Sequence, residues 1–250
     1  MTRSVLARAY GGPEVLAIQD IVLAAPGEGE VLVDVCAAGT NPIDYKLYSG
    51  AMGDDPAALP MPVGMEVAGV VAAAAPGAQG YTGALAVGDE VIATNVRGGY
   101  SEQVLVAGAD VGHKPAALSF EEAAGLILAG ATAWHLLMKT DVGTGDTVLI
   151  HAAGGGVGLM AVQLAAARGA RVIATASPSR HDKLRGYGAT RSPTGRGWPT
   201  GCAPSGRWTP HWTWWEPTRR STPLSNSLPT APASRRSPDS AGPPNSGSRR

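Results

Sequence analysis

Residues 145–177, GDTVLIHAAGGGVGLMAVQLAAARGARVIATAS, decide the fold of this part of the chain. Residues 147–151 form a short apolar run that predicts a buried strand, and residues 171–176 predict a second one. Between them, residues 157–168 have the length and the Ala- and Leu-rich composition of a helix. A glycine-rich turn joins the first strand to this helix, and this order is typical of an α/β fold with a doubly wound parallel sheet.

The glycine-rich turn, AAGGGVG at residues 152–158, is similar to the dinucleotide-binding pattern G-x-G-x-x-G. The pattern positions are Ala153, Gly155 and Gly158, so alanine replaces the first glycine. Gly155 would let the backbone approach a pyrophosphate, Gly158 would let the helix pack on the strand, and the helix N-terminus offers N–H groups to phosphates. A flexible loop is the alternative, but the flanking strands favour a cofactor site formed by Ala153, Gly154, Gly155, Gly156, Val157 and Gly158.

The residues after the second predicted strand indicate which cofactor binds. A site that prefers NADH usually places Asp or Glu there, where the carboxylate binds the ribose hydroxyls. Here the side chains are hydroxyl-bearing or basic, namely Ser177, Ser179, Arg180, His181 and Lys183. Because such groups suit a 2′-phosphate, we predict NADPH, bound by Ser177, Arg180 and His181. The alternative is a solvent-exposed helix start that is basic by chance.

The preceding part of the chain is predicted to be rich in β-structure. Gly-Pro, Pro-Gly and Gly-Asp breaks separate short apolar runs up to about residue 110, which indicates a barrel or sandwich. A short helix is expected to begin at Pro42, whose fixed φ suits a first helical position. Ser119 and Glu122 form a capping-box pattern before an Ala- and Leu-rich helix, and a further helix is expected over 179–187. The expected strands are 3–10, 15–23, 31–37, 67–74, 90–93 and 100–106.

The composition changes near residue 190. Residues 1–190 carry 11 Lys and Arg against 18 Asp and Glu, whereas residues 191–250 carry nine Arg against two acidic residues. The formal net charge of zero is therefore the sum of −7 and +7. The last sixty residues contain 11 of the 20 prolines and five of the six tryptophans but no Val, Ile, Met, Phe or Tyr. We expect a disordered segment there, because it has little to bury.

The stretch 145–177, with GTNPIDYKLYSG at 39–50 and PVGMEVAGVV at 62–71, resembles the medium-chain dehydrogenase/reductases. Within them it is similar to the zinc-independent quinone oxidoreductase (zeta-crystallin-like) branch. The resemblance covers residues 3–189 and implies a GroES-like β-barrel catalytic domain at 1–118. It further implies a connecting helix with the first half of a Rossmann domain at 119–190, a small-molecule substrate in the cleft between the domains, and homodimers as common family assemblies.

Two departures from the zinc-dependent relatives indicate that no catalytic metal is used. Asn41 stands where those relatives carry a zinc-binding Cys, and Met65 stands where they carry the His of a G-H-E motif. Neither residue is a usual zinc ligand. Cys36 is expected to be a buried structural thiol, and His113 and His135 are expected to be surface or packing residues.

The resemblance implies hydride transfer from C4 of NADPH to a quinone or an α,β-unsaturated carbonyl. By motif position it assigns Asn41 to the nicotinamide and substrate side, Asp44 and Tyr48 to the short helix that follows, and Thr132 in AGATAW to a place beside the nicotinamide. In the alternative interpretation, Asp44 caps its helix, Tyr45 and Tyr48 pack, and Thr132 is structural. An enoyl reductase, which shares this scaffold, is the alternative enzyme.

A slip of reading frame near residue 190 would explain the foreign composition of residues 191–250. Tryptophan has the single codon TGG, so a shift by one base converts each Trp into Leu, Val or Met followed by Gly, Ala, Val, Asp or Glu. Around residues 207–215 the shifted sequence can be written VDAALDLVG, which is strand-like. Such a slip would replace half of the Rossmann domain, and we then expect weak or no activity. The alternatives are a natural Pro/Ser/Arg tail, or a non-catalytic nucleotide- or nucleic-acid-binding remnant that uses Arg and Trp.

Composition also restricts where the protein acts. Two cysteines exclude a disulfide framework, the N-terminus shows no signal peptide, and the longest apolar run, VAGVVAAAA, is too short to span a membrane. We therefore expect a cytoplasmic protein without a membrane partner, for which nucleic acid is an unlikely ligand.

Overall fold

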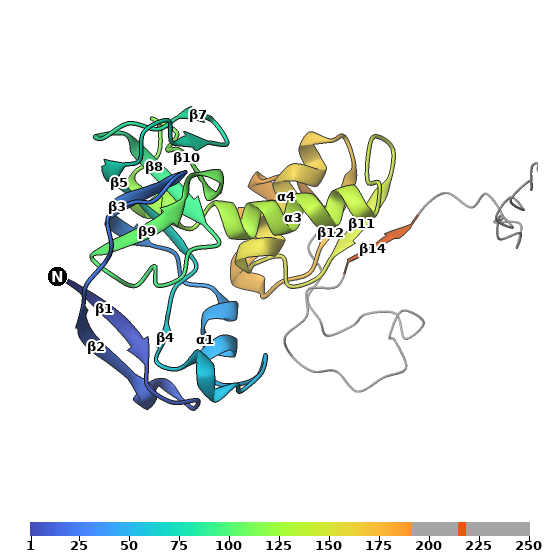
Figure 1. The fold of residues 1–250 in the computed structure, drawn as a ribbon. Coiled ribbons are helices and arrows are strands. Elements are labelled where there is room, and N and C mark those ends of the chain that lie inside the picture. The colour runs from blue at the N-terminus through green and yellow to red at the C-terminus, as the bar shows by residue number, and fades with distance from the viewer. Residues whose placement is uncertain (192–214, 219–250) are drawn as a thin grey trace, which may run out of the picture. The chain divides into compact units, whose positions relative to one another are not determined.

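The computed structural model describes residues 1–191 and 215–218, which all lie in one compact unit, Met1–Thr218. A β-rich region comes first, and a helical connection then leads to a parallel sheet with helices beside it (Figure 1). This is the predicted order, and the expected α/β fold class is confirmed.

The β-rich region contains a three-stranded and a five-stranded antiparallel sheet. The smaller sheet has the order β2-β1-β4, with β1 Thr2–Ala7, β2 Leu16–Ile21 and β4 Met61–Pro62. The larger has the order β10-β8-β5-β3-β9, with β3 Glu30–Ala38, β5 Glu66–Ala74, β8 Glu90–Thr94, β9 Gln103–Ala107 and β10 Val111–His113. A small hairpin pairs β6 Gln79–Gly80 with β7 Gly83–Ala84. Alternating valines such as Val31 and Val33 fill the core, as the period of two in a half-buried strand requires.

Three helices lie along or after these sheets. α1, Pro42–Tyr48, begins at the predicted proline. The predicted capping box is confirmed, because the Ser119 hydroxyl accepts the Glu122 N–H and the Glu122 carboxylate accepts the Ser119 N–H. The single helix expected after it is instead two helices, α2 Phe120–Ala124 and α3 Ile127–Lys139. Gly125 forms the C-cap of α2, and its N–H donates to the Ala123 carbonyl.

The second sheet has the order β13-β12-β11-β14. β11 Thr147–Ile150, β12 Arg171–Ala174 and β13 Ala189–Arg191 are parallel, and α4 Gly156–Ala167 and α5 His181–Gly186 connect them. α4 packs on β11, on β12 and on α3 (Figure 1). A continuous apolar cluster results, in which the side chains of Leu137, Val148 and Val162 are fully buried.

Two expectations about single segments are wrong. Cys36 is exposed rather than buried, because the alternation of β3 places it on the same face as exposed Asp34, while Val33 and Val35 face the core. Residues Trp215–Thr218, expected to lack regular structure, form β14, which pairs antiparallel with β11. An open strand edge presents unpaired N–H and C=O groups that an extended segment can satisfy whatever its composition. The disorder expected for the rest of 192–250 lies outside the described residues.

Candidate functional site

In the turn between β11 and α4, the two glycines of the dinucleotide pattern, Gly155 and Gly158, have different roles. A Cβ atom on Gly158 would lie 2.5 Å from the Ala152 carbonyl oxygen and 2.7 Å from Ala153 Cα, so packing itself requires glycine there. A Cβ atom on Gly155 would meet only the Ala152 oxygen, at 3.4 Å, and the Gly155 backbone is extended, with φ −85°. The fold therefore does not require glycine at position 155, and the space beside it is open to a ligand.

Backbone groups at the start of α4 form the side of this turn that could face a ligand. Ala153 is buried, and its N–H donates to the Thr175 carbonyl at 2.9 Å, which ties the turn to the segment after β12. The Gly155 N–H donates to the Ala152 carbonyl. The first N–H groups of α4, from Gly156 and Val157 onward, have no partner within the helix and lie at the positive end of its dipole. An anionic group is therefore favoured at this helix end.

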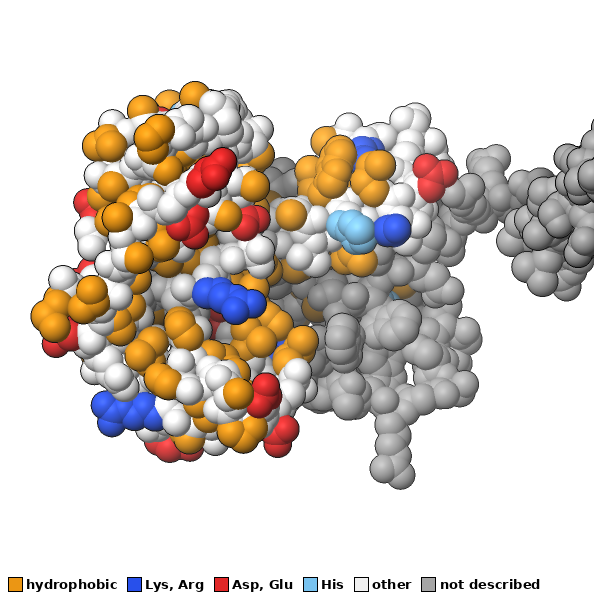
Figure 2. All heavy atoms as spheres, viewed as in Figure 1, with side chains coloured by type: hydrophobic (Ala, Val, Ile, Leu, Met, Phe, Trp, Pro, Cys, Tyr) orange, Lys and Arg blue, Asp and Glu red, His pale blue; other side chains and the backbone are white. Residues whose placement is uncertain are grey.

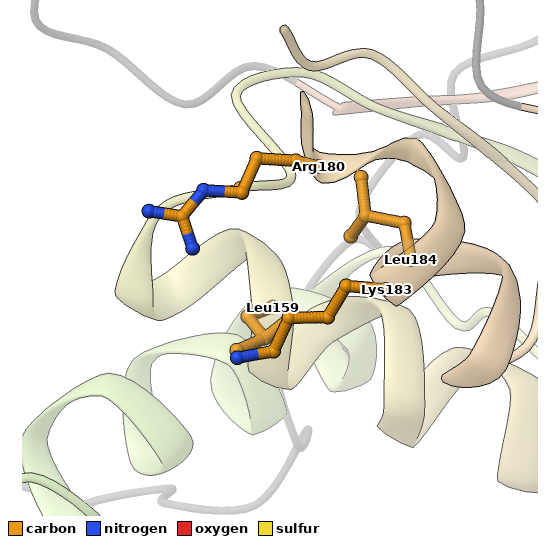
Figure 3. A pocket seen from close by; sticks show the side chains of 5 residues that line it. Leu159, Arg180, Lys183 and Leu184 are labelled. Carbon is orange, nitrogen blue, oxygen red and sulfur yellow. The ribbon is translucent and has the colours of Figure 1, made fainter. Parts of the chain in front are cut away.

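A small pocket lies beside the turn. The residues that line it come from the turn, from α4 and from the segment after β12. They are Gly154, Leu159, Arg180, Lys183 and Leu184. Figure 3 shows the Arg180 and Lys183 side chains extending in the same direction from that segment. The pocket is also lined by the apolar side chains of Leu159 and Leu184, so the cationic residues Arg180 and Lys183 lie next to an apolar surface.

The other residues predicted for the cofactor form local contacts. The Ser177 and Ser179 hydroxyls lie 3.3 Å apart and both side chains are exposed. The His181 ring nitrogen Nε2 lies 3.1 Å from the Ala176 carbonyl, so that end of the ring is occupied by the chain itself. Of the basic residues in this segment, Arg180 and Lys183 line the pocket, and the Lys183 Nζ also lies over the Tyr187 ring, 5.8 Å from its centroid.

Asn41 and Asp44 form a second group at the start of α1. The Asp44 carboxylate accepts the Asn41 N–H at 2.7 Å, which is one half of a capping box. The other half is present as well, with the Asn41 side chain at the Asp44 N–H, and Asn41 Nδ2 also donates to Glu66 Oε2 at 3.1 Å. The amide oxygen of Asn41 therefore faces the start of its own helix, and its second lone pair could accept a hydrogen bond from a ligand.

Asp44 is more deeply buried than a capping residue needs to be. It is 4% exposed, and Oδ2 also accepts the Tyr100 hydroxyl at 2.8 Å. Burial, together with this hydrogen bond to Asp44 and the nearby Tyr48, raises the pKa of Tyr100 well above its usual range. Asp44 Oδ1 has no hydrogen-bond partner among the described residues, which is unusual for a buried carboxylate oxygen. Both the capping interpretation and a ligand-side role for Asp44 fit this geometry.

Thr132 is exposed on α3, and its hydroxyl donates to the Leu128 carbonyl one turn earlier, at 2.6 Å. Its hydrogen is therefore used by its own helix, and only its oxygen is left to accept a hydrogen bond. The Leu128 N–H in turn donates to Glu66 Oε1 at 2.8 Å. The predicted residues thus fall into two groups, one at the glycine turn and one in which Glu66 joins Asn41 to the start of α3.

Three residues of the candidate site, Glu66, Tyr100 and Lys183, were not among the site residues predicted from the sequence. A signal for Glu66 was present, because a carboxylate that opens the apolar run EVAGVVAAA is rarely buried without a specific partner. For Tyr100 the sequence contains no such signal, since its partner Asp44 lies 56 residues earlier.

Other features of the described residues bear on which ligands are possible. Within residues 1–191 and 215–218, no group of three or more His, Cys, Asp or Glu side chains could hold a metal ion. No helix in this part of the chain is long and apolar enough to cross a membrane. The face in Figure 2 mixes acidic, apolar and scattered basic side chains, without a continuous basic patch among the described residues. His113 and His135 are exposed, as expected.

A β-rich domain followed by a β-α-β unit with a dinucleotide-type turn defines a class of nucleotide-dependent oxidoreductases. The family of alcohol dehydrogenase GroES-like domains matches residues 27–142. A quinone oxidoreductase of Pseudomonas aeruginosa is 41% identical over 193 residues, which are 76% of this chain and 57% of that protein.

Two solved structures share the fold. Escherichia coli quinone oxidoreductase complexed with NADPH aligns with a TM-score of 0.68 and 35% identity, over 77% of this chain and 58% of that one. A mycobacterial protein complexed with NADPH aligns with a TM-score of 0.69 and 34% identity, over 78% and 59%. The chain spans just over half the length of the curated relatives it matches. It belongs to the medium-chain dehydrogenase/reductase superfamily, in the quinone oxidoreductase branch.

Proposed function

We propose that this chain binds NADPH at the turn between β11 and α4 and reduces a quinone or an α,β-unsaturated carbonyl without a metal. The observation that carries the proposal is a glycine, Gly155, that the fold does not need, beside a pocket with two cations. The two relatives solved with NADPH, one of them a quinone oxidoreductase, support it.

The residues present fit both phosphate groups of this cofactor. The N–H groups at the start of α4 suit the pyrophosphate, because Gly155 leaves the approach to them open. Arg180 and Lys183 suit the 2′-phosphate, with Ser177 as an exposed hydroxyl nearby. Arg180 pairs with no acidic side chain among the described residues, so its guanidinium can bind a phosphate through two hydrogen bonds.

NADPH, when bound, supplies a hydride from C4 of its nicotinamide ring. The chain's own residues would orient the reacting groups. Asn41 presents its amide oxygen and Thr132 its hydroxyl oxygen, and both can accept hydrogen bonds from a carboxamide or a hydroxyl group. Correct placement of two reacting groups accounts for much of the rate enhancement of such reactions.

The cofactor assignment is tested by Arg180→Ala in the full chain, with NADPH and NADH titrated by fluorescence. Loss of a charge-assisted hydrogen bond of about 1.5–3 kcal/mol should weaken NADPH binding about tenfold to a hundredfold and leave NADH binding nearly unchanged. Arg185→Ala is the matched control, because Arg185 on α5 pairs with Asp182 instead of lining the pocket. Tighter binding of NADH than of NADPH by the unmodified chain would reject the assignment.

Substrate profiling separates the two candidate enzymes. Turnover of 1,4-benzoquinone with NADPH favours the quinone reductase, whereas turnover of a conjugated thioester alone favours the enoyl reductase. Two further statements stay predictions. One is that the change of composition at residue 190 reduces activity, and the other is that the chain forms a homodimer. Steady-state NADPH oxidation and light scattering measure them.

A further inference from the structure

Glu66 is a buried carboxylate at the first position of β5, and it is only 1% exposed. Both of its oxygens accept hydrogen bonds, Oε2 from Asn41 Nδ2 and Oε1 from the Leu128 N–H. Gly39 makes room for it, because a Cβ atom there would lie 2.8 Å from Glu66 Oε2. Burying a charge costs several kcal/mol unless it is well paired, so this arrangement needs a reason beyond packing.

The first consequence concerns the direction of the Asn41 amide. A carboxylate without a proton only accepts hydrogen bonds, so it selects the orientation in which Asn41 turns its NH₂ group inward. The amide oxygen is then turned away from Glu66 and toward the Asp44 N–H, with its second lone pair left for the ligand-side role of Asn41. A neutral amide in place of Glu66 would remove this selection, because an amide both donates and accepts.

The second consequence concerns Thr132. The Leu128 N–H is held by Glu66, and the Leu128 carbonyl accepts the Thr132 hydroxyl. Among the described residues, Asn41 and Thr132 are therefore joined through Glu66 and Leu128 and make no hydrogen bond to each other. One carboxylate thus determines both the direction of Asn41 and the place of the helical turn that carries Thr132.

We propose that Glu66 is a positioning residue that sets the orientation of Asn41 and its spacing to Thr132. This inference rests on the proposed function, since it assumes that Asn41 and Thr132 face the nicotinamide and the substrate. The positioning itself can also be measured without catalysis, because it predicts an energetic coupling between two side chains that make no direct hydrogen bond.

The first experiment is a double-mutant cycle in the full chain, with Asn41→Ala and Thr132→Val, measured by urea unfolding. If Glu66 joins the two sites, their effects on the unfolding equilibrium constant should depart from additivity by about fivefold, and the departure should vanish in the Glu66→Gln background. Additive effects with Glu66 present would overturn the proposal. Glu66→Asp, which keeps the charge but retracts it by one methylene, replaces Glu66→Gln if that variant does not fold.

The second experiment uses kinetics with NADPH and 1,4-benzoquinone. Glu66→Gln should lower kcat on the order of tenfold to a hundredfold, while the Kd for NADPH changes much less, because the charged phosphates of the cofactor bind at the turn between β11 and α4 and not at Asn41. In the double variant Glu66→Gln with Asn41→Asp, the new amide donates to the new carboxylate, an oxygen again faces the ligand, and part of kcat should return. A merely structural role predicts no such rescue of kcat.

Asp34→Asn is the matched control for both experiments. Asp34 on β3 also accepts a side-chain amide, Gln103 Nε2 at 2.7 Å, but it is exposed and joins neither site residue. It should leave the coupling and kcat unchanged. A chain without turnover would count against the proposed function alone, and the unfolding cycle would still decide the role of Glu66. Unchanged kcat in an active Glu66→Gln variant would overturn the positioning role.

Discussion

The two pattern glycines of the turn should respond in opposite ways to the same added methyl group. In Gly158→Ala the new carbon would lie 2.5 Å from the Ala152 oxygen and 2.7 Å from Ala153 Cα, and both of these are backbone atoms. To reach an ordinary contact of about 3.5 Å, α4 must move away from β11 by roughly 1 Å. Overpacking of this kind costs about 1–3 kcal/mol, while the better helix propensity of alanine returns at most about 1 kcal/mol. We expect a net loss of about 1 kcal/mol in the free energy of unfolding.

Gly155→Ala should leave stability almost unchanged and weaken the cofactor. Its methyl meets nothing closer than 3.4 Å and its backbone angles suit alanine, so only the N-cap preference of glycine, roughly 0.5 kcal/mol, is lost. The methyl would, however, occupy the approach to the first N–H groups of α4. Loss of one hydrogen bond to a phosphate, about 1.5–3 kcal/mol, should weaken NADPH binding about tenfold to a hundredfold.

Urea unfolding and NADPH fluorescence titration on the same preparations measure both quantities. The expected pattern is a fall in stability for Gly158→Ala and a fall in affinity at near-native stability for Gly155→Ala. Binding of NADPH by Gly155→Ala as tightly as by the parent chain would refute the assignment of this turn to the pyrophosphate. Parent-like stability of Gly158→Ala would refute the packing explanation instead.

Further predictions concern the described core and the group around Asp44. Leu137→Ala should cost about 2–5 kcal/mol in urea unfolding, because Leu137 is 0% exposed, whereas Met138→Ala next to it, 53% exposed, should cost little. Tyr100→Phe should cost about 1–2 kcal/mol near pH 7, because the buried Asp44 carboxylate loses a hydrogen-bond donor. The folded-state pKa of Tyr100 is raised above its ordinary value of about 10, so the unfolded chain ionises first and this group's contribution to stability is lost as the pH rises past 10. The stability difference between the parent chain and Tyr100→Phe should therefore shrink above pH 10, and a constant difference would contradict the inferred burial of the hydroxyl.

Local patterns predicted those parts of the fold in which neighbours in sequence determine the structure. The start of α1 at Pro42, the capping box of Ser119 and the β11–α4–β12 order all depend on residues within a few positions of one another. The exposure of Cys36 also follows from a local pattern, the period of two in β3, and was missed because the residue type was weighed without the alternation. β14 depends on the free edge of β11, so no composition rule applied to residues 215–218 alone could predict it.

The same distinction separates the two groups of the candidate site. The turn could be located from sequence because its glycines, its strand and its helix are contiguous, although only the structure shows that packing requires Gly158 and leaves Gly155 free. Around Asn41 the partners come from positions 66, 100 and 128, and each contact is a single polar atom meeting another. A buried carboxylate in an apolar strand is the feature of that group that the sequence shows without any resemblance to a family, because a charge that folding removes from water must find donors somewhere. For this reason, Glu66 provides a stricter test of the site than any residue of the glycine motif: its donors come from two separate elements, so its substitution can be detected at both.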